Sequence, residues 1–257
     1  MKRTNLLWLA LILLITTAPT ALAQVGQTKH QEPSDATAYF YMGVEHFKAG
    51  RYKEAVEAYK RAISLKPDLA EAHNNLGATY RKLGWYREAI ESFKRAIQLK
   101  PTDAAYSNLG YTYDDLGHYK DAIDSYKRAI QLKSNNAGVY SNLAVTYRKL
   151  GRYKEAIGYY KQAISINPDL AEAHNNLGVT YYKMGRYKDA IESYNRAISV
   201  KPDYAEAYFN LGVVYLAAKN TSAALEQHTM LKSLDQKLAS EFFNVIYKGK
   251  VLSVSPK

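Results

Sequence analysis

The sequence has no cysteine among its 257 residues, and it has only 7 prolines and 2 tryptophans. Without thiols the chain has no disulfide framework, no zinc site built on cysteine and no thiol nucleophile. Acidic side chains are in the minority, since 24 Asp and Glu face 35 Lys and Arg, for a formal charge of +11. With 47% apolar residues the chain can bury a sizeable core. It is therefore a folded chain, built as globular domains or as one extended repeat array.

Short catalytic and metal-binding motifs are also absent. The sequence has no G-x-S-x-G, no Gly-rich phosphate loop, no H-E-x-x-H and no Asp-rich calcium loop. No two of the 6 histidines have the spacing of metal ligands. We therefore predict that the protein is not an enzyme, with no catalytic residues, no metal and no cofactor.

One long apolar run is present, and it lies at the N-terminus. Lys2 and Arg3 precede the run at 6–15, and Ala-Leu-Ala ends at Ala23. This order predicts a secretory signal peptide over 1–23. The run is half the roughly 20 residues of a membrane-spanning helix, so an uncleaved anchor is the less favoured alternative. We expect an exported protein, periplasmic or secreted and first of all in a bacterial envelope, without stable membrane insertion after cleavage.

The rest of the chain repeats itself. The segment AEAHNNLGATYRKL at 70–83 recurs as AEAHNNLGVTYYKM at 171–184. A period of about 34 residues divides the chain into consecutive units after a flexible linker at 24–35. The units are 36–69, 70–102, 103–136, 137–170, 171–204 and 205–238.

Each unit has the pattern of two amphipathic helices. A small residue stands at the eighth position and an alanine at the twentieth, where two helices must touch, and larger apolar residues lie three or four positions from them. A glycine follows the first helix, and a proline often ends the second. The aspartates after those prolines, Asp68, Asp169 and Asp203, are expected to cap the next helix.

This pattern, aromatic-x-x-Leu-Gly-x-x-Tyr followed by Ala, an aromatic, Ala and Pro, resembles the tetratricopeptide repeat family. The resemblance implies an all-α fold, an α-solenoid of about six helix-turn-helix repeats in a right-handed superhelix. It also implies a concave groove lined by the first helix of each repeat. Neighbouring repeats must stack because no single helix pair buries its apolar face alone.

The last unit departs from the pattern. Lys219 and Asn220 replace the turn glycine, with Asn220 expected to tolerate the left-handed conformation, and His228 stands where an aromatic is usual. An apolar stripe then predicts a capping helix over 237–248, which covers the open end of the array. Residues 249–257 are expected to form a flexible tail.

An asparagine recurs at the sixth position of five consecutive units. These residues, called the asparagine ladder below, are Asn75, Asn108, Asn142, Asn176 and Asn210. Asn forms helices poorly, and its amide can both donate to and accept from an extended peptide backbone. The ladder resembles the one in the repeat domain of protein O-GlcNAc transferase, where it holds peptide. The alternative is that these amides bond only within the scaffold.

Other candidate contact residues share the same helix faces. The basic ones are Lys48, Lys82, Lys149, Lys183, Arg81 and Arg148, and the aromatic ones are Tyr111, Tyr182 and Phe209. Unit three carries Asp114 and Asp115 instead, which predicts a basic groove with an acidic patch midway. We expect it to bind a partly acidic peptide of mixed charge, although plain solvated charge is the alternative.

These observations favour an exported, non-catalytic scaffold that binds an extended peptide or a partner protein in its groove. Two other functions remain open, a binder of anionic envelope glycan or surface and an accessory subunit that recruits a separate enzyme. Nucleic acid is not expected as a partner, because an exported basic protein seldom meets it. The sequence leaves the oligomeric state undetermined.

Overall fold

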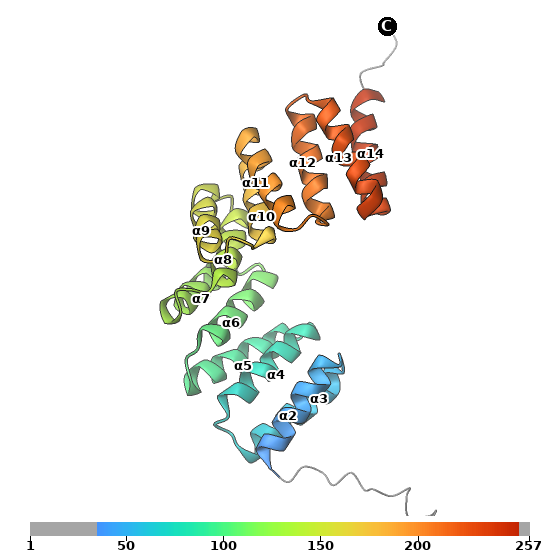
Figure 1. Cartoon of the computed structure of the whole chain (residues 1–257). Helices are drawn as coiled ribbons and strands as arrows, with labels where there is room; N and C mark the ends of the chain where they lie inside the picture. Colours follow the sequence, from blue (N-terminus) through green and yellow to red (C-terminus); the bar gives the residue numbers. More distant parts are fainter. Residues whose placement is uncertain (1–34, 252–257) are drawn as a thin grey trace, which may run out of the picture.

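The computed structural model describes residues 35–251. The predicted signal peptide, nearly all of the linker and residues 252–257 lie outside the described residues. Regular structure within 35–251 consists of α-helices only, which pack in chain order into one elongated array (Figure 1). The predicted all-α solenoid is confirmed.

Every predicted unit contains two helices, and the first begins at the unit's first residue. The first helices are α2 (Ala36–Lys48), α4 (Ala70–Lys82), α6 (Asp103–Asp115), α8 (Ala137–Lys149), α10 (Ala171–Lys183) and α12 (Ala205–Ala217). The second helices are α3 (Tyr52–Leu65), α5 (Tyr86–Leu99), α7 (Tyr119–Leu132), α9 (Tyr153–Ile166), α11 (Tyr187–Val200) and α13 (Thr221–Leu234). A last helix, α14 (Gln236–Val251), follows the six pairs.

The expected caps at Asp68, Asp169 and Asp203 are wrong. The N-cap residues of the three helices concerned are Leu69, Leu170 and Tyr204, and none of them caps with its side chain. A tight backbone turn, such as Leu69 N–H donating to the Lys66 carbonyl at 3.2 Å, places each aspartate one residue too early. Side-chain caps occur elsewhere, for example where Asp35 accepts from the Ala38 N–H at 2.7 Å.

The turn between the two helices of a unit needs a left-handed residue. The five turn glycines have φ between 72° and 77°, a region that glycine enters without steric cost. In the sixth unit Lys219 takes this conformation, with φ 62°, rather than Asn220 as expected. Asn220 instead caps α13, because its side chain accepts from the Ala223 N–H at 3.1 Å.

Within each of the first five pairs, an aromatic ring of the second helix packs on the small residue at the eighth position of the first. The rings at this position in the first five units, Tyr59, Phe93, Tyr126, Tyr160 and Tyr194, are at most 1% exposed. A methyl group added to Gly178 would lie 2.7 Å from the Tyr194 ring, closer than packed atoms approach. In unit five the glycine is therefore required for the two helices to pack at this distance, whereas unit four accommodates an alanine, Ala144.

The array curves with the first helices on its inner side. Each first helix contacts the first helix of the next unit, whereas successive second helices do not contact one another within the described residues. The spacing between units is therefore shorter along the first helices, which line the concave side that the repeat pattern implies.

Helix α14 closes the C-terminal end by supplying a missing ring. His228 occupies the aromatic position of the sixth unit, and the ring that covers Gly212 is that of Phe242, on α14. Phe242 is 0% exposed and packs with Tyr208, Ala224 and Leu231. The predicted capping helix exists, but it includes 249–251, which were expected to belong to the flexible tail.

Replacing Phe242 with Ala should release the cap. A buried Phe→Ala change costs about 3–5 kcal/mol, so we expect the free energy of unfolding, from urea denaturation, to fall by about 3 kcal/mol. The matched control is Phe243→Ala on the same helix, because Phe243 is 44% exposed and should cost less than about 1 kcal/mol. Equal losses for the two variants would contradict the assignment of Phe242 as the capping ring.

Candidate functional site

The candidate site is the inner face of the array, called the groove below. It is formed by the fifth, sixth, ninth, twelfth and thirteenth positions of each first helix. At its N-terminal end there is a hollow of about 180 Å³, lined by Val44, Phe47, Lys48, Asn75 and Ala78 at these positions and by Tyr59 of α3. Equivalent positions follow along the whole groove because the repeat fixes the register of each first helix.

At its N-terminal end, the asparagine ladder is hydrogen-bonded within the protein. The Asn108 amide donates to the Asn74 side-chain carbonyl at 3.2 Å, and the Asn74 amide donates to that of Asn75 at 3.4 Å. Burial raises the pKa of the Tyr59 phenol to about 12, an effect that a hydrogen bond with Asn75 partly offsets. These amides link the first three units to one another.

Asn210, the last residue of the ladder, is also hydrogen-bonded within the protein. The Asn210 amide donates to the Asn175 side-chain carbonyl at 3.1 Å, and Asn175 is buried. Asn74 and Asn175 both stand at the fifth position and were not among the predicted site residues. The doubled asparagine in HNNLG was the signal that could have identified them.

The third and fourth residues of the ladder, Asn142 and Asn176, are different. Within the described residues the side chains of Asn142 and Asn176 make no hydrogen bond, and neither has a polar atom sealed from solvent. Both residues are half-buried on consecutive first helices. Their donors and acceptors are therefore available to a ligand in the groove.

The acidic residues of unit three are neutralised by their neighbours. Asp114 accepts from the Thr146 hydroxyl at 2.9 Å and pairs with Lys149, both from unit four. Asp115 pairs with Arg81 of unit two at 3.1 Å. The expected free acidic patch midway along the groove is therefore corrected to a set of ion pairs that joins three units.

The remaining basic candidates divide into paired and unpaired residues. Lys48 pairs with Glu45 one turn away, at 2.9 Å, on the exposed surface. In the described part of the chain, Lys82, Arg148 and Lys183 have no carboxylate within ion-pair distance. The positive charge of the groove that is open to a ligand comes from these three side chains.

The aromatic candidates have three different environments. Tyr111 is 41% exposed and lies under the Arg81 guanidinium, 4.3 Å from ring centroid to carbon. Tyr182 is half-buried against Tyr187, with ring centroids 5.9 Å apart. The Phe209 ring packs edge-on against Phe242 at 5.4 Å, so its position is fixed by the capping helix.

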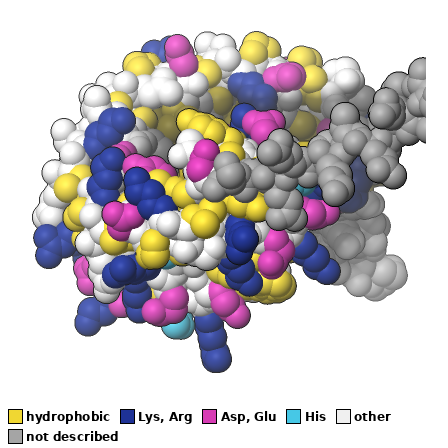
Figure 2. All heavy atoms as spheres, turned by 90° about the horizontal axis from the view of Figure 1, so that it is seen from below, with side chains coloured by type: hydrophobic (Ala, Val, Ile, Leu, Met, Phe, Trp, Pro, Cys, Tyr) yellow, Lys and Arg dark blue, Asp and Glu magenta, His cyan; other side chains and the backbone are white. Residues whose placement is uncertain are grey.

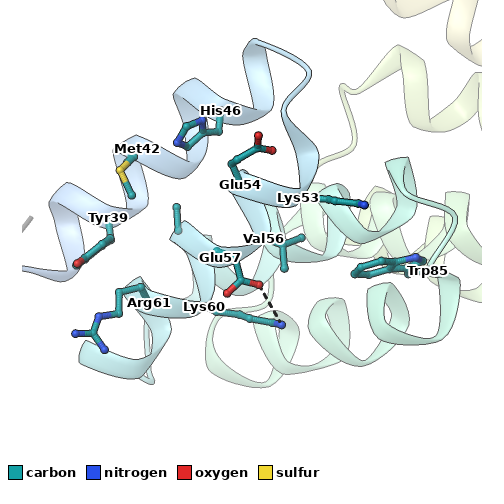
Figure 3. Close-up of a pocket in the computed structure, with 11 residues that line it drawn as sticks. Tyr39, Met42, His46, Lys53, Glu54, Val56, Glu57, Lys60, Arg61 and Trp85 are labelled. Carbon is teal, nitrogen blue, oxygen red and sulfur yellow. Dashed lines mark ion pairs between the residues drawn. The ribbon is translucent and has the colours of Figure 1, made fainter. Parts of the chain in front are cut away.

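A larger hollow, of about 680 Å³, lies outside the groove at the N-terminal end. Tyr39, Met42 and His46 of α2 point toward it, as do Glu54, Glu57 and Arg61 of α3 (Figure 3). In the later units the corresponding residues of the first helix pack beneath the second helix of the preceding unit. This end of the molecule carries Lys and Arg interspersed with Asp and Glu (Figure 2), and the hollow marks the open end of the stack.

Neither metal chemistry nor a membrane span is indicated in residues 35–251. That segment holds no cluster of three or more His, Asp or Glu side chains suited to a metal ion. None of its helices combines the length and apolarity needed to cross a bilayer.

Comparison with known families identifies the repeat. Tetratricopeptide repeat models match residues 135–203, 169–237 and 70–103, and a TPR repeat model matches 43–84 and 112–151. The chain belongs to the tetratricopeptide repeat family. A comparison with curated protein sequences finds no match.

Solved structures of TPR proteins share the fold. MamA is 30% identical over 66% of this chain and 94% of its own, with a TM-score of 0.59. PilW, a type IV pilus biogenesis factor, is 19% identical over 82% of this chain and 98% of its own, with a TM-score of 0.74. YrrB, described as a TPR protein with an unusual peptide-binding site, is 24% identical over 72% of this chain and 97% of its own, with a TM-score of 0.57.

The ion pairs around Asp114 should stabilise the array. Asp114→Ala removes one acceptor from both Lys149 and Thr146, while relieving a negative charge at a helix C-terminus. We expect a loss of about 1–2 kcal/mol in the free energy of unfolding. The control Glu45→Ala breaks an exposed pair and should cost less than about 0.5 kcal/mol. Losses of the same size would mean that the Asp114 contacts are ordinary surface pairs.

Proposed function

We propose that this protein is an exported, non-catalytic scaffold that holds an extended segment of a partner protein in its groove. The observation that carries the proposal is the pair of unoccupied amides, Asn142 and Asn176, on consecutive repeats of the concave side. Relatives such as MamA, YrrB and PilW support a role in protein–protein interaction.

The chemistry of the two amides suits a peptide backbone. Each side chain offers two N–H donors and a carbonyl acceptor, while an extended peptide presents N–H and C=O groups alternately along its length. Because these are backbone contacts, they grip the segment without reading its sequence. Sequence preference must then come from side-chain contacts elsewhere in the groove.

The charge of the groove favours a partly acidic segment of mixed charge. Lys82, Arg148 and Lys183 are free to meet acidic side chains, whereas the ion pairs of Asp114 and Asp115 leave no free positive charge in the stretch between Lys82 and Arg148. A polyanionic glycan would favour an unbroken basic stripe, so the interruption argues against that alternative.

Export remains part of the proposal on sequence grounds. The positive residues at 2–3, the apolar run and the Ala-x-Ala ending at Ala23 support it. The partner is then expected in the periplasm or outside the cell. An accessory subunit that recruits an enzyme would use the same groove, with the enzyme chain supplying the bound segment.

The direct test is retention of a partner by the full chain, expressed with an affinity tag in its native host. Asn142→Ala combined with Asn176→Ala should lower retention about 10-fold or more, since each hydrogen bond contributes about 0.5–1.5 kcal/mol. The matched control is Asn195→Ala, an exposed asparagine on the second helix α11.

Circular dichroism of each variant must match that of the unchanged protein, so that loss of binding is separated from loss of fold. If the double variant retains the partner as well as the Asn195 variant does, the partner binds elsewhere. In that case the two amides are only part of the scaffold, and the proposal fails.

A further inference from the structure

Two arginines stand at equivalent positions of the groove, and only one of them is ion-paired within the described residues. Arg81 and Arg148 both occupy the twelfth position of their unit, in the last turn of α4 and of α8. Each faces the aromatic core ring of the following unit, Tyr126 or Tyr194, where the guanidinium offsets part of the pKa increase that burial imposes on the phenol. The surroundings of Arg148 can therefore be compared directly with those of Arg81.

Arg81 is satisfied within the protein. It pairs with Asp115, the thirteenth residue of the next unit, at 3.1 Å, and it stacks over Tyr111, the ninth residue of that unit. The two side chains of the ion pair are only 25% and 28% exposed. No further anion is needed at this position.

Arg148 lacks both of these partners. The next unit has Lys183 where Asp115 stands and Val179 where Tyr111 stands. No carboxylate of the described residues lies within ion-pair distance of Arg148, and its Nε is buried without a hydrogen bond. The buried Tyr160 hydroxyl lies near the guanidinium, which offsets part of the increase that burial imposes on the pKa of this phenol.

An unpaired, partly buried guanidinium beside a second cation is costly, because desolvation and like-charge repulsion both act against it. A carboxylate would relieve both costs and could accept two parallel N–H bonds from the arginine. Arg148 lies on the same first helix as Asn142, six residues C-terminal to it, and Asn176 lies on the next first helix. Apart from Lys82 of unit two, the groove side chains found above to lack a partner are thus in units four and five.

We infer that Arg148, assisted by Lys183, binds the side-chain carboxylate of an Asp or Glu in the bound segment. The inference rests on the proposed function, since the segment must lie in the groove. A segment held by both Asn142 and Asn176 spans units four and five, so its backbone extends beyond the unit that carries Arg148. The carboxylate is therefore that of an internal acidic residue rather than that of a chain end.

The test follows the Nε–H signal of each arginine by ¹⁵N–¹H NMR in the full chain. The probe is the blocked peptide acetyl-Gly-Gly-Glu-Gly-Gly-amide, and the comparison is the same peptide with Gln in place of Glu. We expect the Glu peptide to shift the Arg148 signal in a saturable way, with an affinity at least fivefold above that of the Gln peptide. The Arg81 signal should not shift, because the Arg81 guanidinium is already paired with Asp115.

A second variant keeps the test independent of any loss of folding. Lys183→Asp places a carboxylate where Asp115 stands relative to Arg81. We expect this variant to raise the melting temperature and to abolish the response of Arg148 to the Glu peptide. Arg148→Gln should also remove the preference for Glu over Gln, with unchanged circular dichroism.

Several outcomes would overturn the inference. These are no shift at Arg148, equal responses to the Glu and Gln peptides, or an unchanged response in Lys183→Asp. A stronger response to acetyl-Gly-Gly-Gln-Gly-Gly with a free C-terminus would assign the site to a chain end instead.

Failure of this inference is separable from failure of the proposed function. If the asparagine variants lose the natural partner but Arg148 ignores the Glu peptide, the groove binds a segment without acidic selectivity. If Arg148 selects the Glu peptide while the asparagine variants keep the partner, the anion site stands and the backbone-binding role of the ladder is wrong.

Discussion

The packing of one aromatic ring on one small residue is the contact on which the whole array depends. It brings the two helices of each of the first five units together, and stacking of the units then places every first helix on the inner side. The sixth unit shows how strict the requirement is, because its own ring is replaced by His228 and α14 contributes Phe242 in its place. The groove is a consequence of this repeated contact rather than of any local motif.

On that uniform scaffold, nearly identical repeats differ in how their polar groups are satisfied. Units two and three bind to each other through Asn74, Asn108, Arg81 and Asp115. In units four and five, Asn142, Asn176, Arg148 and Lys183 are the same kinds of side chain, but they have no such partners within the described residues. Small substitutions on a constant backbone therefore separate structural interfaces from an open binding surface, as expected for an array in which each repeat contacts only its neighbours.

Much of the fold could be predicted from the sequence because each feature is local and repeated. The start of every first helix follows from the period, and the left-handed turns follow from their glycines. The sequence predicted the capping helix but did not show that its Phe242 covers Gly212, and the expected cap at Asp68 was wrong by one residue. Charge pairing was missed because Asp114 meets Lys149 only after the units stack.

The asparagine ladder contains side chains that are hydrogen-bonded within the protein and side chains that are not. This difference, on which the proposed function rests, can be measured without any ligand. The side-chain amide protons of Asn108 and Asn210 donate within the protein, whereas those of Asn142 and Asn176 do not. In ¹⁵N-labelled protein, solvent exchange of the side-chain NH₂ protons should therefore be slow for the first two residues and fast for the second two. Equal protection of all four would contradict the account.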